Sequence, residues 1–286
     1  MERDTKSTPL VTIAIPIYNA EKYLRYAIQS CINQTYQNWE LLLMCDGSTD
    51  TSIGIMEEMA AYDSRIRVIY DDVNKGLVYR LNQSIKLAKG KYYARMDADD
   101  IMAVNRIEEE VNFLELHPMV DVVGTSMMMI DGDNHIMGSS LQTTDSIFVH
   151  PSVMGKTSWF LSNPYDEAAL RAEDFDLWNR TRRFSAFANI ESPLMFYRIY
   201  GMPTTRKMLL SYKTMCRLTL RYKEYHWNIL FACRYFLIYL LKICVLIFLS
   251  SFNKQSIIIK KRKYISVPIE NRLTELDLEK SITSKV

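Results

Sequence analysis

The chain has 286 residues, 48% of them hydrophobic, which is enough to bury the core of one large domain with an extension. The charges are unevenly divided: residues 1–200 hold 19 Lys and Arg against 28 Asp and Glu, a net −9, and residues 201–286 hold 16 against 5, a net +11. The acidic part excludes a nucleic acid partner and would hold a diphosphate only through a metal ion, whereas the basic part favours phosphates or anionic lipid. The five cysteines fit no zinc or disulfide spacing and indicate reduced, intracellular thiols, and residues 1–10 show no signal peptide.

The first 100 residues alternate between strand and helix patterns. Strands are predicted at 11–18, 39–46, 65–72 and 91–97, and helices over 20–34, after the turn at 47–50, and over 76–89. Short links between such elements predict an α/β fold, with a Rossmann-like, mainly parallel sheet flanked by helices. Such sheets bind ligands at the carboxyl ends of their strands, where five polar residues fall: Tyr18, Asp46, Asp71, Asp72 and Asp97.

An acidic cluster ends the fourth predicted strand, in the sequence KYYARMDADD over 91–100. Asp97 and Asp99 would point to the same side of an extended chain, where two carboxylates repel one another unless a cation lies between them. Mg²⁺ or Mn²⁺ is the expected cation, because hard divalent ions prefer carboxylate oxygens. The alternative is a solvated turn in which Asp100 caps the next helix.

Two common phosphate-binding motifs do not fit the sequence. The first strand continues into IPIYNAEKY, without the GxGxxG of dinucleotide-binding folds. Gly155, Lys156 and Thr157 match the end of a P-loop, but His150 stands where its first glycine would be. Phosphate is therefore expected to be held through a metal.

Three segments together resemble the family 2 glycosyltransferases, which have the GT-A fold. They are VTIAIPIYNAEKYLRYAIQSCINQTYQNWELLLMCDGSTD from residue 11, NKGLVYRLNQSIKLAKGKYYARMDADD from residue 74, and YDEAALRAEDFDLWNR from residue 165. Within the family, the resemblance is to bacterial enzymes that build surface polysaccharides or the sugar part of lipopolysaccharide.

The resemblance implies roles for individual residues. For the nucleotide it implies Pro16 and Tyr18 as lining, Glu40 behind them, Asp46 on the base, and further contacts from Asn74, Gly76, Asn82, Arg95 and Asp97. Asp97 and Asp99 would bind the metal, and Asp174, with Glu173 beside it, would be the catalytic base. His150, Arg180 and Arg198 are further motif positions, near the acceptor or elsewhere in the site.

Structural alternatives stay open for several of these positions. Asp46 could be only a turn residue, Asn82 a solvated helix residue, and His150 a packed or capping residue. Glu173 and Asp174 could simply stabilise a helix N-terminus. The sequence also departs from the family, because Tyr200 stands where a histidine follows Tyr-Arg-x and no QxxRW is present. We therefore expect transfer of one sugar per encounter rather than processive synthesis.

The C-terminal part has a different character. Residues 227–252 are strongly apolar but contain Arg234 and Lys242, and a basic run follows at 260–263. A charge near the centre of a bilayer costs about 2.5–3.5 kcal/mol, so a helix lying in the interface at the cytoplasmic face of the inner membrane is expected, with both cations reaching its surface. A single span and a buried core helix or oligomer contact are the alternatives. The expected divisions are a catalytic domain over 1–200, a helical, membrane-associating extension over 201–268 and a polar, mobile tail over 269–286.

Taken together, these features predict an inverting, metal-dependent glycosyltransferase. It would transfer a sugar from a nucleotide-sugar donor, a UDP-sugar in the first instance, to a lipid-linked or polysaccharide acceptor. Two alternatives are a sugar nucleotidyltransferase, which would need a basic Gly-rich loop after the first strand, and an inactive carbohydrate-binding or scaffold protein. The acidic cluster at 97–100 and the Glu173–Asp174 pair argue against an inactive protein.

Overall fold

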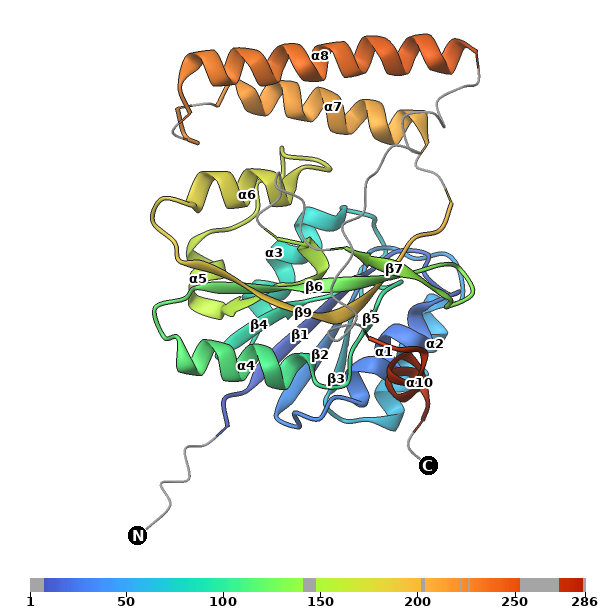
Figure 1. Cartoon of the computed structure of the whole chain (residues 1–286). Coiled ribbons are helices and arrows are strands. Elements are labelled where there is room, and N and C mark those ends of the chain that lie inside the picture. The colour runs from blue at the N-terminus through green and yellow to red at the C-terminus, as the bar shows by residue number, and fades with distance from the viewer. Residues whose placement is uncertain are drawn as a thin grey trace. The chain divides into compact units, whose positions relative to one another are not determined.

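The computed structural model describes residues 8–140, 148–201, 204–221, 223–225, 227–252 and 273–284 (Figure 1). The chain forms two compact units. The sheet unit comprises Met1–Ser162, Ala186–Ile199 and Ile265–Val286, and the helical unit comprises Asn163–Ser185 and Tyr200–Tyr264. This division differs from the expected boundaries at 200 and 268, because the chain enters the helical unit twice and returns to the sheet unit at its end.

The sheet unit is built on four parallel strands in the order β3-β2-β1-β4. They are β1 (Val11–Ile17), β2 (Trp39–Cys45), β3 (Ile66–Ile69) and β4 (Tyr92–Arg95). Each lies inside a range predicted as strand, and β1 and β2 are buried almost throughout. This is the strand order of half a Rossmann fold, which collects the carboxyl ends of all four strands along one edge.

The sheet continues beyond β4 with mixed pairing, in the order β8-β6-β9-β5, and β7 pairs with β6. These strands are β5 (Ile101–Met102), β6 (Val122–Ile130), β7 (Ile136–Ser140), β8 (Met154–Lys156) and β9 (Phe187–Arg198). β8 is antiparallel to both β4 and β6, whereas β6 and β9 are parallel. A short 3₁₀ turn, η1 (His150–Ser152), precedes β8.

Helices cover both faces of this sheet (Figure 1). One face packs against α1 (Leu24–Ile32), α2 (Ser52–Tyr62) and α4 (Arg106–Leu116), and it uses Tyr92, Ala94 and Met96 of the β4 segment. The other face carries α3 (Leu77–Leu87) and α5 (Thr157–Ser162). Tyr93 belongs to that face, since its hydroxyl lies 2.7 Å from Ser84 Oγ and its ring lies edge-on to Phe160. The side chains of residues 92–96 therefore alternate between the two faces of the sheet.

The end of the chain corrects the expectation of a mobile tail. Residues 275–282 form α10 (Glu275–Ile282), which begins with a capping box between Thr274 and Asp277. Leu278 is 4% exposed and packs in a cluster with residues of β5, β6 and β9: Ile101, Met128, Ile130 and Phe196. Residues 273–284 are therefore part of the sheet unit, because α10 has an apolar side that the sheet covers.

Asn33, just after α1, fixes the other end of α10. Its Nδ2 donates to the carbonyl oxygens of Lys280, Ser281 and Thr283 at 3.1, 3.0 and 2.8 Å. These carbonyls lie at a helix C-terminus and have no acceptor role within the helix itself. One side chain from the start of the chain thus satisfies the last turn of its final helix.

The helical unit consists of α6 (Glu173–Thr181), α7 (Thr205–Thr219) and α8 (Ile229–Ser251). The rings of Phe175, Tyr225 and Trp227 pack against one another, with centroids 5.2 to 6.3 Å apart. α8 packs beside α7 but is otherwise open, since only 11% of its apolar window is buried. The alternative of a buried core helix is therefore wrong. The basic run at 260–263 lies outside the described residues.

Candidate functional site

Loops at the carboxyl ends of β1 and β2 are joined by side-chain hydrogen bonds. The Asn19 side chain accepts a bond from the N–H of Thr49 at 2.8 Å, and Asp50 accepts from the N–H of Glu21 at 3.0 Å. Asp50 also accepts from the N–H of Ser52, at the start of α2. Asn19 has a left-handed φ of 50°, a conformation that asparagine tolerates. These bonds hold the edge beside Tyr18, whose side chain is half exposed.

Asp46, the residue after β2, organises the loop that follows β3. Its carboxylate accepts bonds from the N–H groups of Lys75 at 2.8 Å and Gly76 at 3.0 Å. Arg80 Nε donates to the same carboxylate at 2.7 Å, and Arg80 is completely buried. Asp46 is thus more than a turn residue, because it ties β2 to the loop at 70–76 and to α3.

Asp71 completes this buried ion cluster. Arg80 Nη1 lies 3.0 Å from its carboxylate and Lys75 Nζ lies 2.7 Å away. The Lys75 ammonium, the N–H of Val73 and the Arg80 guanidinium together lower the pKa of Asp71 to about 2. Asp71 is therefore ionised at neutral pH, and the loop after β3 carries a fixed pattern of charge.

Gly47 allows this loop to lie against the end of β2. Its φ is +69°, and a Cβ there would lie 2.8 Å from the backbone nitrogen of Asn74. A larger residue would push the 73–76 segment away from Asp46. Asn74 itself is exposed, at the point where a bound molecule could reach it.

The acidic cluster follows β4 in a turn, since that strand ends at Arg95. Asp97, Asp99 and Asp100 each offer a carboxylate oxygen, and the three oxygens lie within 4.8 Å of one another. Asp97 also pairs with Arg95. Burial, followed by the neighbouring charges of Asp97 and Asp99, raises the pKa of Asp100 well above its ordinary value. The turn therefore brings three carboxylates together.

Asp100 does not cap the next helix, so that alternative is wrong. α4 begins at Arg106 with Asn105 as its N-cap residue, and Asp100 lies before β5 instead. Asp100 Oδ1 accepts from the N–H of Arg198 at 2.8 Å, whereas its buried Oδ2 has no hydrogen-bond partner among the described residues. An orphaned carboxylate oxygen beside two further carboxylates fits the ligand set of Mg²⁺ or Mn²⁺.

Arg198 supports the acidic turn from β9. Its guanidinium donates to the carbonyl oxygens of Asp99 at 2.7 Å and Asp131 at 2.8 Å, and it lies 4.1 Å from the ring centre of Tyr23. These bonds give Arg198 a positioning role at the acidic turn, and its place near the acceptor or elsewhere in the site stays a prediction.

Two other predicted positions lie in different surroundings. Glu40 is the second residue of β2, at the opposite end from Asp46, and accepts from Thr12 Oγ1 at 2.7 Å and the N–H of Lys89 at 2.8 Å. Its place behind the nucleotide stays a prediction. His150 is buried in η1, and its role near the acceptor or elsewhere in the site stays a prediction. Pro16 is the sixth residue of β1, and Asn82 is a half-buried residue of α3.

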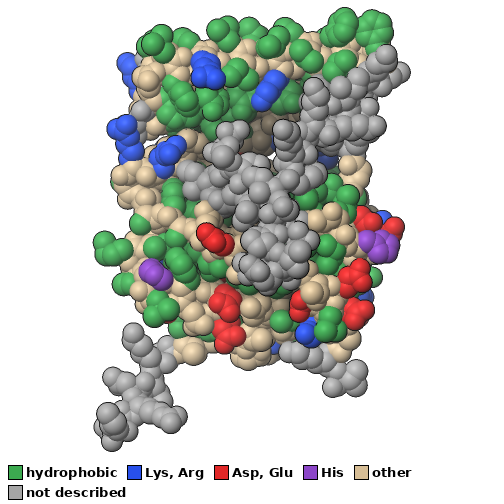
Figure 2. Space-filling view, in the orientation of Figure 1, with side chains coloured by type: hydrophobic (Ala, Val, Ile, Leu, Met, Phe, Trp, Pro, Cys, Tyr) green, Lys and Arg blue, Asp and Glu red, His purple; other side chains and the backbone are tan. Residues whose placement is uncertain are grey.

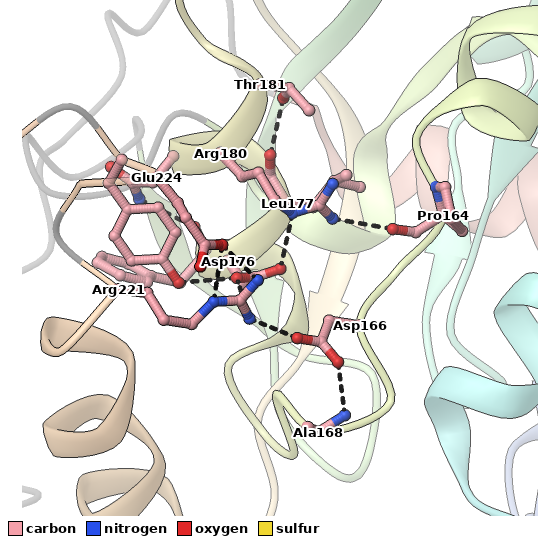
Figure 3. A network of polar contacts seen from close by, with 12 residues as sticks. Pro164, Asp166, Ala168, Asp176, Leu177, Arg180, Thr181, Arg221 and Glu224 are labelled. Atoms are coloured by element: carbon pink, nitrogen blue, oxygen red, sulfur yellow. Dashed lines mark hydrogen bonds and ion pairs between the residues drawn. The ribbon is translucent and has the colours of Figure 1, made fainter.

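In the helical unit, Asp176 is the centre of a polar network (Figure 3). It is completely buried and accepts from Tyr225 at 2.7 Å, and it lies 3.2 Å from Arg221 and 3.3 Å from Arg180. Arg180 also donates to the carbonyl of Pro164 at 2.9 Å. Both contacts brace α6, and the predicted place of Arg180 near the acceptor or elsewhere in the site stays a prediction.

Glu173 and Asp174 occupy the first turn of α6, as the sequence predicted. Glu173 is buried, whereas Asp174 is partly exposed and accepts from the N–H of Phe175 at 2.8 Å. The two lie one and two residues after the N-cap Ala172, where the helix dipole stabilises negative charge. Asp174 is therefore an ionisable, accessible carboxylate on a rigid element.

The family sequence model described as "Glycosyl transferase family 2" matches residues 12–190. The chain belongs to this family. An uncharacterized glycosyltransferase of Haemophilus influenzae is 33% identical over 222 residues, which cover 70% of this chain and 68% of that protein. The putative glycosyltransferase EpsE of Bacillus subtilis is 35% identical over 187 residues, 61% of this chain and 67% of that protein. The protein is a glycosyltransferase.

Solved structures share its GT-A fold at low sequence identity. The Staphylococcus aureus TarS fragment 1–349, determined in complex with UDP, has a TM-score of 0.61 at 16% identity and covers 80% of this chain and 70% of that chain. The mannosyltransferase PcManGT from Pyrobaculum calidifontis, in complex with GDP-Man and Mn²⁺, also has a TM-score of 0.61, at 13% identity, and covers 76% and 64% of the two chains.

Several residues of this glycosyltransferase escaped the sequence analysis. Arg80 looks like an ordinary cation on an amphipathic helix, and its pairing with Asp46 spans 34 residues. The sequence assigned Asp100 no ligand role and offered a helix cap as its alternative, although its place next to Asp99 in the acidic cluster was a signal. Asp176 could have been suspected, because the apolar residues Leu177 and Trp178 follow it directly and are buried with it in α6.

Proposed function

We propose that this glycosyltransferase moves one sugar from a nucleotide-sugar donor, a UDP-sugar in the first instance, to a hydroxyl of a lipid-linked or polysaccharide acceptor. The observation that carries the proposal is the carboxylate triplet Asp97, Asp99 and Asp100, which stands at the same sheet edge as Asp46. The similar structures were determined in complex with UDP, UDP-GlcNAc or GDP-Man, which supports a nucleoside diphosphate donor.

Asp46 is the proposed contact of the nucleotide base. Its Oδ2 accepts one bond from the described residues, from the N–H of Gly76, and a carboxylate oxygen can accept two. Arg80 and the N–H of Lys75 hold Oδ1, so the carboxylate is oriented before the nucleotide arrives. Pro16, Tyr18, Asn74, Asn82 and Arg95 are proposed to complete this region.

Asp97, Asp99 and Asp100 are the proposed ligands of Mg²⁺ or Mn²⁺. When bound, the cation supplies positive charge that stabilises the leaving diphosphate. Arg198 and Arg95 keep the carboxylates in place, through the carbonyl of Asp99 and the side chain of Asp97. Fixing these groups in advance removes the need to reorganise them during the reaction.

Asp174 is the proposed catalytic base. It would take the proton of the acceptor hydroxyl as the new glycosidic bond forms, a contribution worth typically ~10²–10⁴-fold in rate. Attack from the face opposite the leaving group inverts the anomeric centre. The first turn of α6 fixes the backbone of Asp174, and the buried Asp176 network fixes α6 itself.

We place the reaction at the cytoplasmic face of the membrane, in the synthesis of a bacterial surface polysaccharide or lipopolysaccharide sugar. The exposed, apolar α8 and the net +11 of residues 201–286 support association with an anionic membrane. A lipid-linked acceptor would be available at such a surface.

A panel of nucleotide sugars tests the proposal most directly. Purified protein is incubated with UDP-, GDP- and dTDP-sugars, with Mn²⁺ or with EDTA, and donor hydrolysis and transfer to lipid extracts are followed. We expect one donor to be consumed only with the metal, and a product of inverted anomeric configuration by NMR. No turnover of any donor with both metal and acceptor lipid present would favour an inactive carbohydrate-binding protein.

A further inference from the structure

Helix α8 is long and apolar enough to cross a membrane, but the path of the chain argues against it. α8 has 23 residues and a mean hydropathy of 2.1. At ~1.5 Å per residue it would span about 35 Å, slightly more than a bilayer core of ~30 Å. Length and composition therefore leave both a crossing and an interfacial helix possible.

The chain leaves the sheet unit before α8 and returns to it afterwards. Ala186–Ile199, before α8, and the described residues 273–284, after it, belong to the same compact unit. The return is a specific contact, because Leu278 of α10 packs on Ile101 of β5 and Asn33 binds the last carbonyls of α10. A single crossing between these segments would place α10 on the opposite side of the membrane from the residues it touches.

No second crossing is available to bring the chain back. α7 has 15 residues and carries four cations, Arg206, Lys207, Lys213 and Arg217, so it is too short and too polar. Among the described residues, α8 is the one helix that meets the requirements of a span. In the sequence 253–272, six Lys and Arg and one Glu exclude another.

Four exposed apolar side chains of α8 form a stripe, and the exposed Arg234 lies beside it. Leu230, Leu237, Leu241 and Phe248 are 80%, 61%, 64% and 64% exposed and recur at intervals of seven, four and seven residues. At 100° per residue these intervals place all four on one side of the helix. The opposite side carries the buried Ala232 and Leu246. Figure 2 shows hydrophobic side chains gathered along this helix, with Lys and Arg among them.

The Lys and Arg side chains of residues 204–252 favour binding to the phosphate groups of a membrane surface. Residues 204–252 hold eight Lys and Arg against one acidic residue, Glu224. Lys242 lies away from the stripe, with its ammonium 4.6 Å from the ring centre of Tyr239 on α8 and 5.9 Å from that of Tyr212 on α7. An interfacial helix lets this ammonium reach lipid phosphates, whereas a crossing would bury it in hydrocarbon.

We propose that α8 enters one leaflet of an anionic membrane from the side and leaves it on the same side, with the stripe of Leu230, Leu237, Leu241 and Phe248 in the acyl region. α10 then closes the chain onto the sheet unit. This inference deepens the membrane association proposed above. Its tests measure the membrane topology of the chain and its binding to lipid vesicles, and neither measures sugar transfer. The inference can therefore fail while the proposed activity stands.

Cysteine labelling reads the topology. In a background with the three cysteines outside the core replaced, Cys216→Ala, Cys233→Ala and Cys244→Ala, the reporters are Glu109→Cys on α4 and Glu279→Cys on α10, both at exposed positions. A membrane-impermeant maleimide is added to inside-out and right-side-out vesicles of the expressing cells. We expect both reporters to react in inside-out vesicles only. Reaction of the two from opposite sides would overturn the proposal in favour of a span.

Flotation of the protein with lipid vesicles tests whether a membrane or a second copy of the chain covers the stripe. The purified full chain is mixed with vesicles of phosphatidylcholine alone or with 30% phosphatidylglycerol, at low and high salt. We expect binding that rises with the anionic lipid, falls only partly with salt, and drops about tenfold or more in Leu241→Glu. Leu116→Glu, an equally exposed leucine of α4, is the matched control and should float normally. Failure to float, with a soluble dimer that Leu241→Glu dissociates, would show a second copy on this face and overturn the proposal.

Discussion

Arg80 Nε lies 2.7 Å from Asp46 Oδ1, and the Arg80 side chain has no exposed surface. The pair joins the carboxyl end of β2 to α3, and the guanidinium also donates to the carbonyl of Val73 at 2.9 Å. A charge buried in this way is tolerated only when its partners remain in place. The loop at 70–76 is therefore shaped by ions rather than by apolar packing.

Replacing Arg80 tests this arrangement. We expect Arg80→Ala to lower the free energy of unfolding by ~3–5 kcal/mol, because it leaves the buried carboxylate of Asp46 uncompensated. Urea unfolding followed by circular dichroism measures the change. Arg25→Ala removes a pair with Glu58 that is 50% and 62% exposed, and should cost no more than ~1 kcal/mol. Equal losses in the two variants would contradict the role given to Arg80.

The sequence predicted those parts of the fold that depend on local pattern. Period-two alternation places Tyr92, Ala94 and Met96 on one face of the sheet, and the apolar stripe of Leu24, Ala27, Ile28 and Cys31 identified α1. Once the parallel strands are predicted, the residues at their carboxyl ends are known as well. The positions of Asp46 and of the acidic cluster at the sheet edge were therefore also predictable.

Contacts between distant segments were not predictable in the same way. Arg80 pairs with Asp46, and α10 docks on Asn33. In both cases the sequence around one partner gives no information about the position of the other. The tail appeared polar because Leu278 and Ile282 are too few to give a periodic signal. Glu40 and Arg198 were assigned to the site by family position, and their bonds to Thr12 and to the carbonyl of Asp99 could not be predicted from the sequence.

The lowered pKa of Asp71 predicts a pH dependence of stability. Its ordinary pKa is 3.8 and its folded pKa is about 2, so the folded state binds the proton less tightly than the unfolded state. The stabilisation is complete above about pH 4 and is lost as the pH falls toward 2. Asp71→Asn should therefore destabilise the protein most above pH 4, and the difference from the native chain should shrink as the pH falls. Urea unfolding at pH 6, 4 and 3 measures this, and a difference independent of pH would contradict it.

The acidic triplet predicts a metal-dependent effect of Asp99→Asn. With a UDP donor, we expect the variant to bind UDP at least about tenfold more weakly in Mn²⁺ but almost normally in EDTA, because the cation needs the carboxylate's charge. Isothermal titration calorimetry measures both. Asp72→Asn removes an exposed carboxylate from the same sheet edge and should bind UDP normally in either condition. UDP affinity that does not respond to metal in the native chain would remove the metal from the proposed mechanism.

Asp174 and Asp176 lie on the same turn of α6. Replacing each in turn distinguishes an effect on catalysis from an effect on stability. We expect Asp174→Asn to keep its stability and donor affinity but to lose at least ~10²-fold in kcat, because an amide cannot accept the acceptor's proton. Asp176→Asn should instead unfold at lower urea, since Tyr225, Arg180 and Arg221 all contact its carboxylate. A near-normal kcat in Asp174→Asn would transfer the proposed base role to Glu173, which Glu173→Gln then tests.

Two leucines of α10 test whether the end of the chain stabilises the sheet unit. Leu278 is 4% exposed, against Ile101, Met128, Ile130 and Phe196, whereas Leu276 is 59% exposed on the same helix. Leu278→Ala should lower the free energy of unfolding by ~2–5 kcal/mol, because it leaves a cavity beside β5. Leu276→Ala should stay within ~0.5 kcal/mol of the native chain, since it changes helix propensity by the same amount without changing the core. Urea unfolding of both variants gives the comparison. Equal values would mean that α10 is not held on the sheet, and would also remove the closed chain path that keeps α8 from crossing the membrane.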